Sequence, residues 1–308
     1  MECEYEQDHA GYKKEKTVKR VLITGARSYI GTSVRNYLNQ WPEDYQVDVM
    51  DLRGDTWSGK SFAEYDSIFH VAGIAHQDSG KISQDRREQY FSVNTKLCAS
   101  VAEKARDSGV KQFIFMSSMS VYRGEGSLKQ PVFIQKCTYP TPKGVYAKSK
   151  LEAENLLEKL QNKNFAVCIL RPPMIYGKGC KGNYRLLSKW ARTLPFFPDM
   201  QNERSMLYVG NLCTFVKFMI DDQSQGLFFP QNAEYVSTSK MVVEIANVHG
   251  KAIHLTRVFN GILSMLSGKV SMIDKAFGNL MYDKNMSTYG KAYQLTGFLD
   301  SIIESELL

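Results

Sequence analysis

Strand-like and helix-like segments alternate from Val18 to Pro173, and this alternation constrains the fold more than any other feature of the chain. The strand segments are short apolar runs, and the helix segments repeat their apolar residues at helical spacing. Such alternation predicts an α/β fold, a doubly wound parallel sheet with helices on both faces. The expected strands are Val21–Ile23, Tyr45–Asp51, Ser67–Gly73, Gln112–Ser118 and Phe165–Pro173, and the expected helices are Ile30–Leu38, Asn94–Gly109 and Tyr146–Leu160.

The same pattern divides the chain into three regions. Residues 1–17 are polar and mixed in charge, which predicts a flexible extension before the first strand. Residues 18–173 hold the alternating segments and form the expected sheet domain. In residues 174–308 the alternation fades into short helices, loops and one strand-like stretch, Gly226–Phe229. This last region predicts a smaller lobe laid against the carboxyl edge of the sheet.

The composition of the 308 residues narrows the class of protein. Hydrophobic residues make up 43% and charged residues 23%, as in an ordinary globular enzyme. No apolar run approaches the ~20 residues of a membrane span. The N-terminus also lacks the apolar core of a signal peptide, so we expect a cytoplasmic protein. The net charge of +7 is spread along the chain, which fits a polyanionic small substrate better than nucleic acid.

Neither a metal site nor a disulfide framework is expected. The six cysteines are scattered without a Cys-x-x-Cys pair, which favours reduced thiols. His70 has no acidic or cysteine partner at ligand spacing, so it is better interpreted as a buried, hydrogen-bonded strand residue.

The stretch Leu255–Met281 is apolar and holds three basic residues, Arg257, Lys269 and Lys275. Apolar residues at helical spacing usually belong to a core or to a subunit face. We expect one of these here rather than contact with a membrane.

A turn between Gly25 and Gly31 joins the first strand to the first helix. Backbone N–H groups at a helix N-terminus point at phosphate, and a residue without a Cβ lets the backbone approach closely. Two glycines at this spacing also suit a plain strand–helix connection. Ser28 stands where a third glycine is usual, and its hydroxyl could donate to phosphate. Because the Cβ of Ser28 keeps the backbone further from the pyrophosphate, we expect weaker or displaced cofactor binding rather than its loss.

Asp51 ends the second expected strand and lies 20 residues after the second glycine of the turn. This is the separation of a carboxylate that binds the ribose of a dinucleotide. Its charge would repel a 2′-phosphate and favours NAD, whereas Arg27 and Arg53 could tolerate NADP. Only 15 residues separate Asp51 from Asp66, which is short for a crossover helix and a further strand. Asp55 is therefore an alternative contact for the ribose or the adenine.

Three residues indicate proton-transfer chemistry. Tyr146 and Lys150 lie four apart and share one face of a helix. An ammonium beside a phenol favours the phenolate, so we expect Lys150 to lower the pKa of Tyr146 and ready it to exchange a proton. Ser118 ends a parallel strand, where open α/β sheets bind ligands, and its hydroxyl can hydrogen-bond a reacting oxygen. Asn94 could cap the helix that it opens.

Together these elements resemble the extended short-chain dehydrogenase/reductases, namely the NAD-dependent epimerase/dehydratase family and its branch similar to UDP-glucose 4-epimerase. The resemblance covers residues 18–212, through "TGARSYIG", "IFHVAGIAH", "VNT", "FIFMSSMSVY", "YAKSK", "LRPPMIYGKG" and "ERSMLYVGNL". It implies a Rossmann-type domain that binds NAD(P) in residues 18–173 and a substrate-binding lobe in residues 174–308. It also implies a UDP-sugar substrate from bacterial polysaccharide synthesis and a homodimer.

The resemblance further implies roles for single residues. The catalytic set is Ser118, Tyr146 and Lys150, and the nucleotide diphosphate of the substrate meets Asn183 and Arg204. Asn94, instead of capping a helix, would support the active site. With Arg27 added for its charge, the expected cofactor site is Gly25, Arg27, Ser28, Tyr29, Ile30, Gly31, Asp51, Ala72, Gly73, Lys150 and Pro173.

Departures from the family pattern narrow the activity. Ser118 is followed by Met119 and Ser120, which cannot supply the acid and base that a 4,6-dehydratase needs. Met174 stands where the epimerase has an asparagine, and the second lobe lacks the usual Arg-Gly-Asp element. These departures leave the sugar-binding pocket, and with it the identity of the sugar, undefined. We expect a 4-epimerase of a UDP-hexose or UDP-N-acetylhexosamine that works through a transient 4-keto intermediate. A 4-ketoreductase of a UDP-4-keto-6-deoxy-hexosamine and a non-catalytic dinucleotide-binding regulator are the alternatives.

Overall fold

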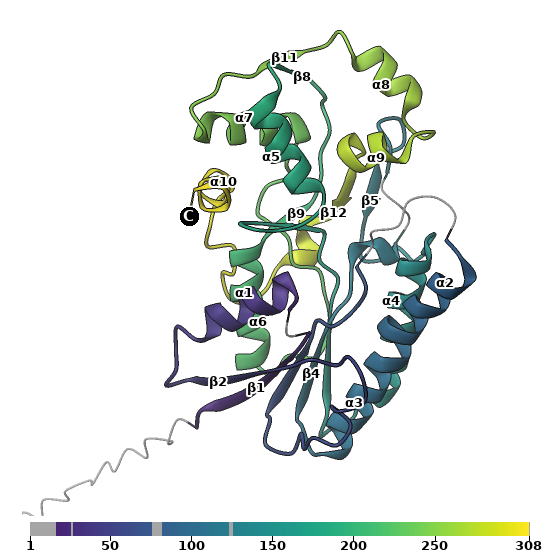
Figure 1. The fold of residues 1–308 in the computed structure, drawn as a ribbon, viewed down its shortest axis with the longest axis vertical. Coiled ribbons are helices and arrows are strands. Elements are labelled where there is room, and N and C mark those ends of the chain that lie inside the picture. Colours follow the sequence, from purple (N-terminus) through teal and green to yellow (C-terminus); the bar gives the residue numbers. More distant parts are fainter. Residues whose placement is uncertain (1–16, 26, 76–81, 123–125, 308) are drawn as a thin grey trace, which may run out of the picture.

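The centre of the molecule is a six-stranded sheet in which every strand is parallel to its neighbours (Figure 1). The computed structural model describes residues 17–25, 27–75, 82–122 and 126–307, so the expected extension lies almost wholly outside the described residues. The strand order is β10-β6-β4-β3-β1-β2. The strands are β1 (Lys19–Thr24), β2 (Tyr45–Met50), β3 (Ser67–His70), β4 (Gln112–Met116), β6 (Ala166–Leu170) and β10 (Gly226–Phe228).

Helices cover both faces of this sheet. Every residue of β3 and β4 is buried, as expected for parallel strands that are covered on two sides. One core cluster joins Val34 to Val216, and another joins Val101 to Leu157. The first pair comes from α1 (Tyr29–Leu38) and α6 (Val209–Asp221), and the second from α3 (Cys98–Asp107) and α4 (Val145–Leu160). The predicted α/β, doubly wound fold is confirmed.

A π-helical insertion interrupts the helix that precedes β4. The α-helix α2 (Gln84–Phe91) continues into a π-helix, η1 (Ser92–Leu97), and then directly into α3. Asn94 therefore lies inside a longer helical segment and is not its N-cap. Insertions of this kind are frequent at functional sites, and this one faces the edge of the sheet described next.

The connection from β2 to β3 determines where the sheet can bind a ligand. Residues 51–66 are all described and contain neither a helix nor a strand, in agreement with their short spacing. β2 pairs with one side of β1, and β3 pairs with the other side. The connections of β1 and β3 therefore leave in opposite directions. Open α/β sheets bind their ligands at the carboxyl ends of such neighbouring strands.

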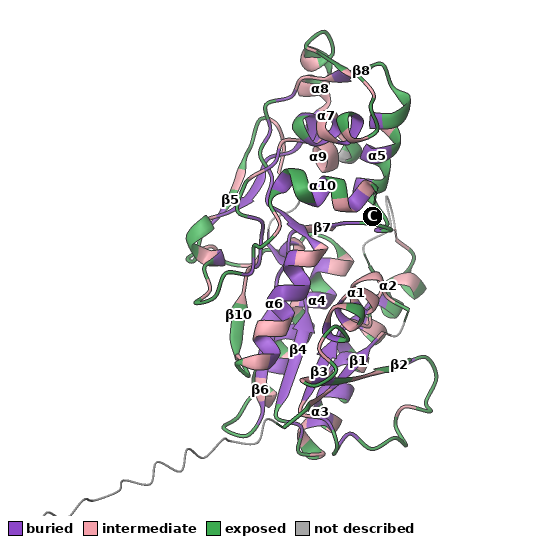
Figure 2. Cartoon of the chain, turned by 90° about the vertical axis from the view of Figure 1, so that its left-hand side faces the viewer, coloured by how far each residue is buried: buried purple, intermediate pink, exposed green. Residues whose placement is uncertain are grey.

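A smaller lobe lies beyond the carboxyl ends of these strands (Figure 1). Its core joins Leu187, Val242 and Ile302, and Figure 2 shows buried residues continuing from the sheet into it. Three parallel strand pairs belong to it, namely β5 (Val132–Ile134) with β12 (Leu280–Tyr282), β7 (Met174–Tyr176) with β9 (Met206–Tyr208), and β8 (Phe196–Pro198) with β11 (His254–Thr256). The helices are α5 (Asn183–Thr193), α7 (Thr238–Val248), α8 (Asn260–Leu266), α9 (Ser271–Phe277) and α10 (Phe298–Glu306), with 3₁₀ turns η2 (Met119–Val121) and η3 (Lys284–Ser287).

Two elements of residues 174–308 lie in the sheet layer rather than in the smaller lobe. Strand β10, which begins at the expected strand-like stretch, pairs with β6 at the edge of the sheet. Helix α6 packs beside α1 on one face of the sheet. The chain thus returns to the sheet after it has begun the lobe.

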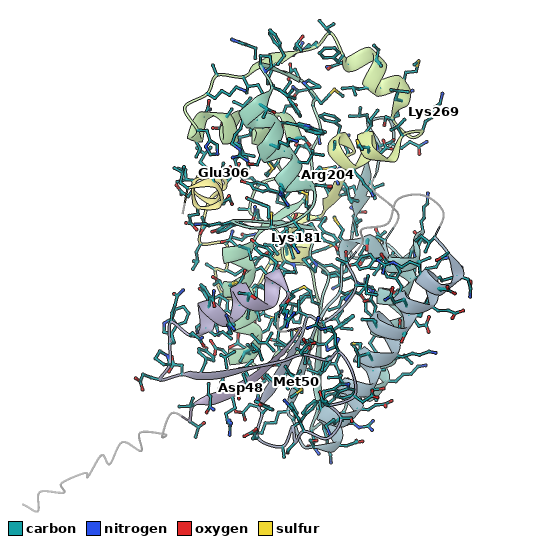
Figure 3. All side chains as sticks on the ribbon, in the orientation of Figure 1. Asp48, Met50, Lys181, Arg204, Lys269 and Glu306 are labelled. Atoms are coloured by element: carbon teal, nitrogen blue, oxygen red, sulfur yellow. The ribbon has the colours of Figure 1, made fainter. Side chains whose placement is uncertain are left out.

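The stretch Leu255–Met281, expected to belong to a core or to a subunit face, is only partly buried in the core. Leu280 and Met281 are buried, but α8 has no buried residue, and Ile262 and Met265 are each 58% exposed. The core interpretation is therefore wrong for α8, because this helix packs on the lobe with one side only. Figure 3 shows Arg204 inside the lobe and Lys269 at its outer end. No helix of the described segments is long and apolar enough to cross a membrane.

Candidate active site

A cavity of about 620 Å³ lies at the carboxyl ends of β1 and β3. The turn after β1 approaches the chain after β3 so closely that only glycine fits at its start. Gly25 has a φ of 91°, and a Cβ there would lie 2.8 Å from the backbone nitrogen of Ala72. The cavity is lined by Gly25, Arg27, Ser28, Asp51, Leu52, Arg53, Gly54, Val71, Ala72, Gly73, Ile74, Gln89, Val93 and Leu97.

Ser28 is the N-cap of α1. Its backbone is extended, and its hydroxyl oxygen accepts a hydrogen bond of 2.9 Å from the N–H of Gly31. A Cβ on Gly31 would lie 2.6 Å from that oxygen, so the cap and the second glycine depend on each other. The serine that replaces the usual glycine therefore fixes the start of the helix. Its hydroxyl hydrogen is still available for the expected donation to a phosphate.

The side chains of Tyr29 and Ile30, which follow Ser28, do not line this cavity. The ring of Tyr29 packs against the core of the smaller lobe. Burial raises the pKa of its phenol above the ordinary range. Ile30 lines a neighbouring cavity. A contact of either residue with a pyrophosphate would therefore use the backbone N–H groups of the first helical turn.

Asp51, and not Asp55, lines the cavity. Its Oδ1 accepts hydrogen bonds of 3.0 Å from both the backbone N–H and the Nε of Arg53. These hydrogen bonds hold the pKa of the Asp51 carboxyl well below its usual range, and the charge of Arg27 acts in the same direction. The carboxylate is thus ionised and oriented at the rim, with both arginines that the sequence singled out beside it.

The three expected catalytic residues converge on a second cavity, of about 190 Å³. Ser118, Tyr146 and Lys150 all line it, and the hydroxyls of Ser118 and Tyr146 share a hydrogen bond. The Nζ of Lys150 donates to the carbonyl of Met116 at 2.8 Å. Pro173 closes one side. This catalytic cavity and the larger cavity are both lined by Val71, Gly73 and Ile74, which places them side by side.

The electrostatics of this pair differ from the expectation. Burial raises the pKa of Tyr146 to about 12, against the opposing hydrogen bond from Ser118. Burial also lowers the pKa of Lys150 to about 8. The expected lowering of the Tyr146 pKa by Lys150 is therefore not observed. Removal from water penalises phenolate and ammonium alike, and the ammonium is directed at a carbonyl oxygen.

Asn94 supports the site from the π-helix. Its Oδ1 accepts a hydrogen bond of 2.7 Å from the N–H of Ile74, and its Nδ2 donates to the Ile74 carbonyl at 3.1 Å. The same Nδ2 donates to Ser149 Oγ at 3.1 Å. Asn94 thereby ties the loop after β3 to α4, the helix that carries Tyr146 and Lys150. Of the two roles considered for this residue, the structure shows the supporting one.

Sequence reasoning missed a buried ion pair behind the catalytic cavity. The Nε of Arg171 donates to both carboxylate oxygens of Glu154, at 3.1 and 3.2 Å, and the two side chains are 6% and 1% exposed. Ser117 Oγ donates to the same carboxylate, and Arg171 Nη1 donates to the hydroxyl of Tyr122 at 2.7 Å. The available signal was the position of Glu154, one helical turn after Lys150 and on the same helix face.

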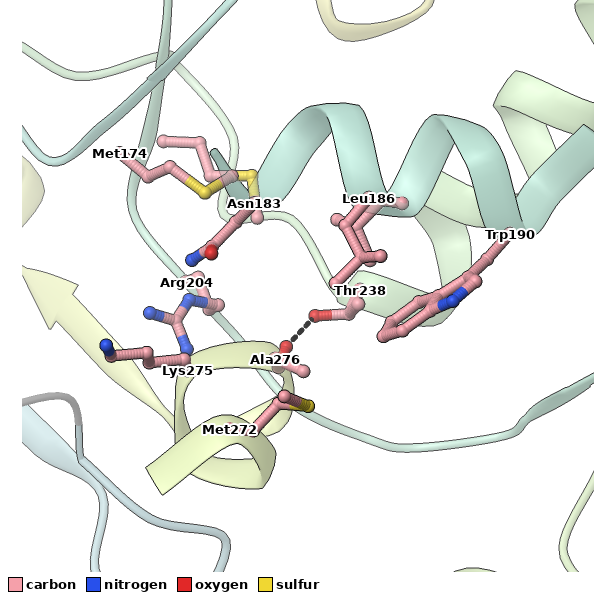
Figure 4. Close-up of a pocket in the computed structure, with 11 residues that line it drawn as sticks. Met174, Asn183, Leu186, Trp190, Arg204, Thr238, Met272, Lys275 and Ala276 are labelled. Atoms are coloured by element: carbon pink, nitrogen blue, oxygen red, sulfur yellow. Dashed lines mark hydrogen bonds between the residues drawn. The ribbon is translucent and has the colours of Figure 1, made fainter. Parts of the chain in front are cut away.

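A third cavity, of about 280 Å³, lies between α5 and α9 and brings together Asn183 and Arg204 (Figure 4). Arg204 is buried, and its Nη1 donates to the carbonyls of Asp274 and Gly278 at 3.0 and 2.9 Å. Met174 faces this cavity whereas Ile175 faces the catalytic cavity, so the two lie on opposite faces of β7. The remaining lining is largely apolar, with Leu186, Leu187, Trp190, Met206, Thr238, Met272, Lys275 and Ala276.

His70 stays inside the sheet, as expected. Its Nδ1 shares a hydrogen bond of 2.9 Å with Thr24 Oγ1, and its ring stacks on Phe113. Burial lowers its pKa to about 3, so the ring is neutral. Within the described segments, no group of three His, Cys, Asp or Glu side chains is placed to hold a metal ion.

The cavity of about 620 Å³ is here called the switch-point cavity, because the connections of β1 and β3 leave in opposite directions at its site. Together with the glycine turn and the capped helix, it is typical of a fold of the Rossmann type. The chain belongs to the NAD dependent epimerase/dehydratase family, whose sequence model matches residues 21–228. The predicted family is therefore confirmed.

Two relatives illustrate the range of this family. The UDP-glucose 4-epimerase of Vibrio cholerae is 31% identical over 294 residues, which cover 87% of this chain and 88% of the relative. The N-acetyl-alpha-D-glucosaminyl-diphospho-ditrans,octacis-undecaprenol 4-epimerase of Escherichia coli O157:H7 is 29% identical over 226 residues, or 67% of this chain and 64% of the relative.

Solved structures agree on the fold. A UDP-glucuronic acid 4-epimerase from Bacillus cereus in complex with NAD has a TM-score of 0.68 at 16% identity, over 92% of this chain and 96% of that one. A human epimerase family protein with NADPH has a TM-score of 0.73 at 12% identity, over 93% and 98%. Members of this fold thus bind either cofactor.

Proposed function

We propose that the chain is an NAD-dependent sugar-nucleotide 4-epimerase that acts on a UDP-hexose or UDP-N-acetylhexosamine through a transient 4-keto intermediate. The observation that carries this proposal is the convergence of Ser118, Tyr146 and Lys150 on one cavity beside the switch-point cavity. Membership of the family and the likeness to the Vibrio cholerae epimerase support it.

The residues of the switch-point cavity fit a dinucleotide. The turn at Gly25 leaves no room for a Cβ, and the capped first turn of α1 offers backbone N–H groups to a pyrophosphate. The ionised Asp51 at the rim suits a ribose and repels a 2′-phosphate, so we propose NAD rather than NADP. Lys150 and Pro173 would meet the nicotinamide end. When bound, NAD supplies a hydride acceptor and donor together with a positive charge.

The chain's own residues move the proton. In the proposed reaction the Tyr146 phenolate would take the proton from the sugar O4 while the sugar is oxidised at C4, and the resulting phenol would return it when the 4-keto sugar is reduced on its opposite face. The bound cofactor would accept and return the hydride. Ser118 donates a hydrogen bond to the same oxygen. Because burial raises the pKa of Tyr146 to about 12, the phenolate needs nearby positive charge, which the nicotinamide ring of bound NAD would supply.

The positions of the cavities support separate roles for the two parts of the chain in binding cofactor and substrate. We assign cofactor binding to residues 18–173 and substrate binding to the part of residues 174–308 that surrounds Asn183 and Arg204. A guanidinium suits a diphosphate, and Lys275 lines the same cavity. The five cysteines of the described segments carry free thiols, in keeping with a protein of the reducing cytoplasm.

The test is incubation of the purified protein with a panel of UDP-sugars without added cofactor. Interconversion of C4 stereoisomers, followed by proton NMR, is the expected result. Turnover of a 4-keto sugar nucleotide that consumes NADPH stoichiometrically would instead assign a 4-ketoreductase. Binding of a dinucleotide without turnover of any sugar would identify the chain as a non-catalytic dinucleotide-binding regulator.

A second substrate class is favoured by the third cavity. Its outer wall includes Met272, which is 65% exposed and continues into the uncovered apolar face of α8. The Escherichia coli relative is named for a sugar carried on undecaprenyl diphosphate. A lipid-linked diphosphate sugar would place its diphosphate near Arg204 and its prenyl chain over α9. Epimerisation of such a substrate, with no turnover of the UDP-sugar panel, would select this class.

A further inference from the structure

Residues 255–272 leave a continuous set of apolar side chains in water, here called the α8–α9 surface. Val258 is 80% exposed, Ile262 and Met265 are each 58% exposed, and Met272 is 65% exposed. The set also includes Leu255, Phe259 and Val270. Figure 1 shows β11 and α8 at the end of the smaller lobe that lies away from the sheet, with α9 below α8. Exposed apolar groups of this extent usually mark an interaction site.

Helix α8 packs on the lobe with one side and exposes apolar residues on the opposite side. Leu263 packs against the core of the lobe, and this contact holds the helix in place. Ile262 and Met265 lie three residues apart on the side that faces away, with Val258 four residues before Ile262. A surface helix that met only water on that side would carry polar residues there. The outward face of α8 is therefore suited to a second apolar environment.

The charge around this surface is positive. Residues 251–275 hold four Lys or Arg residues and a single carboxylate, Asp274. That carboxylate is engaged within the turn, where it accepts hydrogen bonds from Ser267 Oγ at 2.7 Å and from the N–H of Gly268 at 2.9 Å. Lys269 and Lys129 are both exposed, and the backbone N–H of Leu128, the neighbour of Lys129, donates to Ser267 Oγ in the same turn. Arg257 pairs with Asp199 at 2.8 Å.

The surface continues into the third cavity. Met272 belongs to the α8–α9 surface and also lines the cavity, and Lys275 lies one helical turn further along α9 (Figure 4). A molecule bound at the surface would thus have direct access to the pocket that holds Arg204 and Asn183. This continuity connects the exposed face to a ligand site.

We propose that the α8–α9 surface binds the surface of an anionic phospholipid bilayer. Apolar side chains at helical spacing enter the boundary between headgroups and acyl chains, and the flanking lysines meet the phosphates. A second copy of the chain suits this surface less well. A two-fold contact would bring the same positively charged surface of both copies together, and like charges repel. The proposal rests on exposure and charge and does not depend on the epimerase chemistry.

The test is co-sedimentation of the full chain with vesicles, without substrate or cofactor. Binding is expected to vesicles of phosphatidylglycerol and phosphatidylethanolamine, to weaken as salt is raised, and to be absent with phosphatidylcholine alone. Ile262→Ser with Met265→Ser should weaken binding at least tenfold. Lys269→Glu should weaken it about fivefold or more, since it removes one cation and adds an anion.

Matched controls are Leu295→Ser, an apolar residue that is 66% exposed elsewhere in the lobe, and Lys163→Glu in the sheet domain. Both should bind vesicles like the unaltered protein. If the double serine variant melts early, Lys269→Glu decides the question. Failure of the unaltered protein to bind anionic vesicles overturns the proposal, and so does binding that the surface variants leave unchanged. A dimer in sedimentation velocity that the double variant splits, without vesicle binding, assigns the surface to a second copy instead.

Discussion

Lys150 is a buried cation, and replacing it should change how the stability of the fold depends on pH. The residue is 5% exposed, and its Nζ lies 4.6 Å from the centroid of the Phe115 ring. Burial lowers its pKa from the ordinary 10.5 to about 8, and Cys98 and Glu154 oppose that lowering. The folded protein therefore binds the lysine proton less tightly than the unfolded chain does.

The magnitude follows from these two pKa values. Below about pH 8 the lysine is protonated in both states, and the folded state carries the full cost of the buried ammonium, about 3 kcal/mol at ~1.36 kcal/mol per pKa unit. As the pH rises from about 8 toward 10.5, the folded state loses its proton first and the cost fades. Between about pH 7 and pH 10 the stability of the unaltered protein should gain about 2–3 kcal/mol from this residue.

Lys150→Met removes the titration and keeps a long apolar side chain. It also leaves the Met116 carbonyl without its donor, a cost that is the same at every pH. In urea unfolding, the stability of the variant relative to the unaltered protein should fall by about 2–3 kcal/mol from about pH 7 to pH 10. Lys148→Met, at an exposed lysine of the same helix, is the matched control. A stability difference that stays constant across this range would show that Lys150 does not carry a buried charge.

Three further predictions concern the site. Glu154→Gln leaves the Arg171 guanidinium buried without its carboxylate, so the free energy of urea unfolding should fall by about 3–5 kcal/mol; a loss below about 1 kcal/mol would contradict a buried ion pair. Tyr146→Phe removes the proton carrier and should lower kcat by about 10²-fold or more, with NAD binding in a fluorescence titration largely kept; full activity would refute its role. Gly25→Ala strains a φ of 91° and drives a Cβ toward Ala72, so calorimetric NAD affinity should fall at least about tenfold. Unchanged affinity would show that this turn is not the cofactor cradle.

The layered architecture could be predicted because it is written in local periodicity. Each buried strand of the sheet is a short apolar run, and α4 begins within one residue of the expected Tyr146. The strand-like stretch at Gly226–Phe229 could be predicted, but neither its pairing with β6 at the edge of the sheet nor the return of α6 to the sheet could be. Both depend on pairing and packing with segments far away in the sequence. The π-helix at Asn94 is likewise set by its contacts rather than by its residues' helix propensity.

Which residues form the site could be predicted better than the pKa values of their side chains. Spacing along the chain put Tyr146 and Lys150 on one helix face and Ser118 at the end of a strand, and the resemblance to the family joined the three into one set. The structure brings all three to one cavity. Spacing also indicated Lys150 as the group that would lower the pKa of Tyr146. Whether burial or a neighbouring charge dominates a pKa depends on solvent access and on hydrogen-bond direction. Both are properties of the packed molecule, and here burial dominates.

One carboxylate connects the three segments on which the proposed chemistry depends. Glu154 lies on α4, two helical turns after Tyr146, and accepts a hydrogen bond from Ser117, the neighbour of Ser118. It also binds Arg171, two residues before Pro173. Buried ion pairs of this kind contribute little net stability, because desolvation offsets most of their attraction. Their geometry is nevertheless strict, since a guanidinium and a carboxylate meet in a planar fork. We therefore infer that the Glu154–Arg171 pair fixes where the serine, the tyrosine and the proline stand relative to one another.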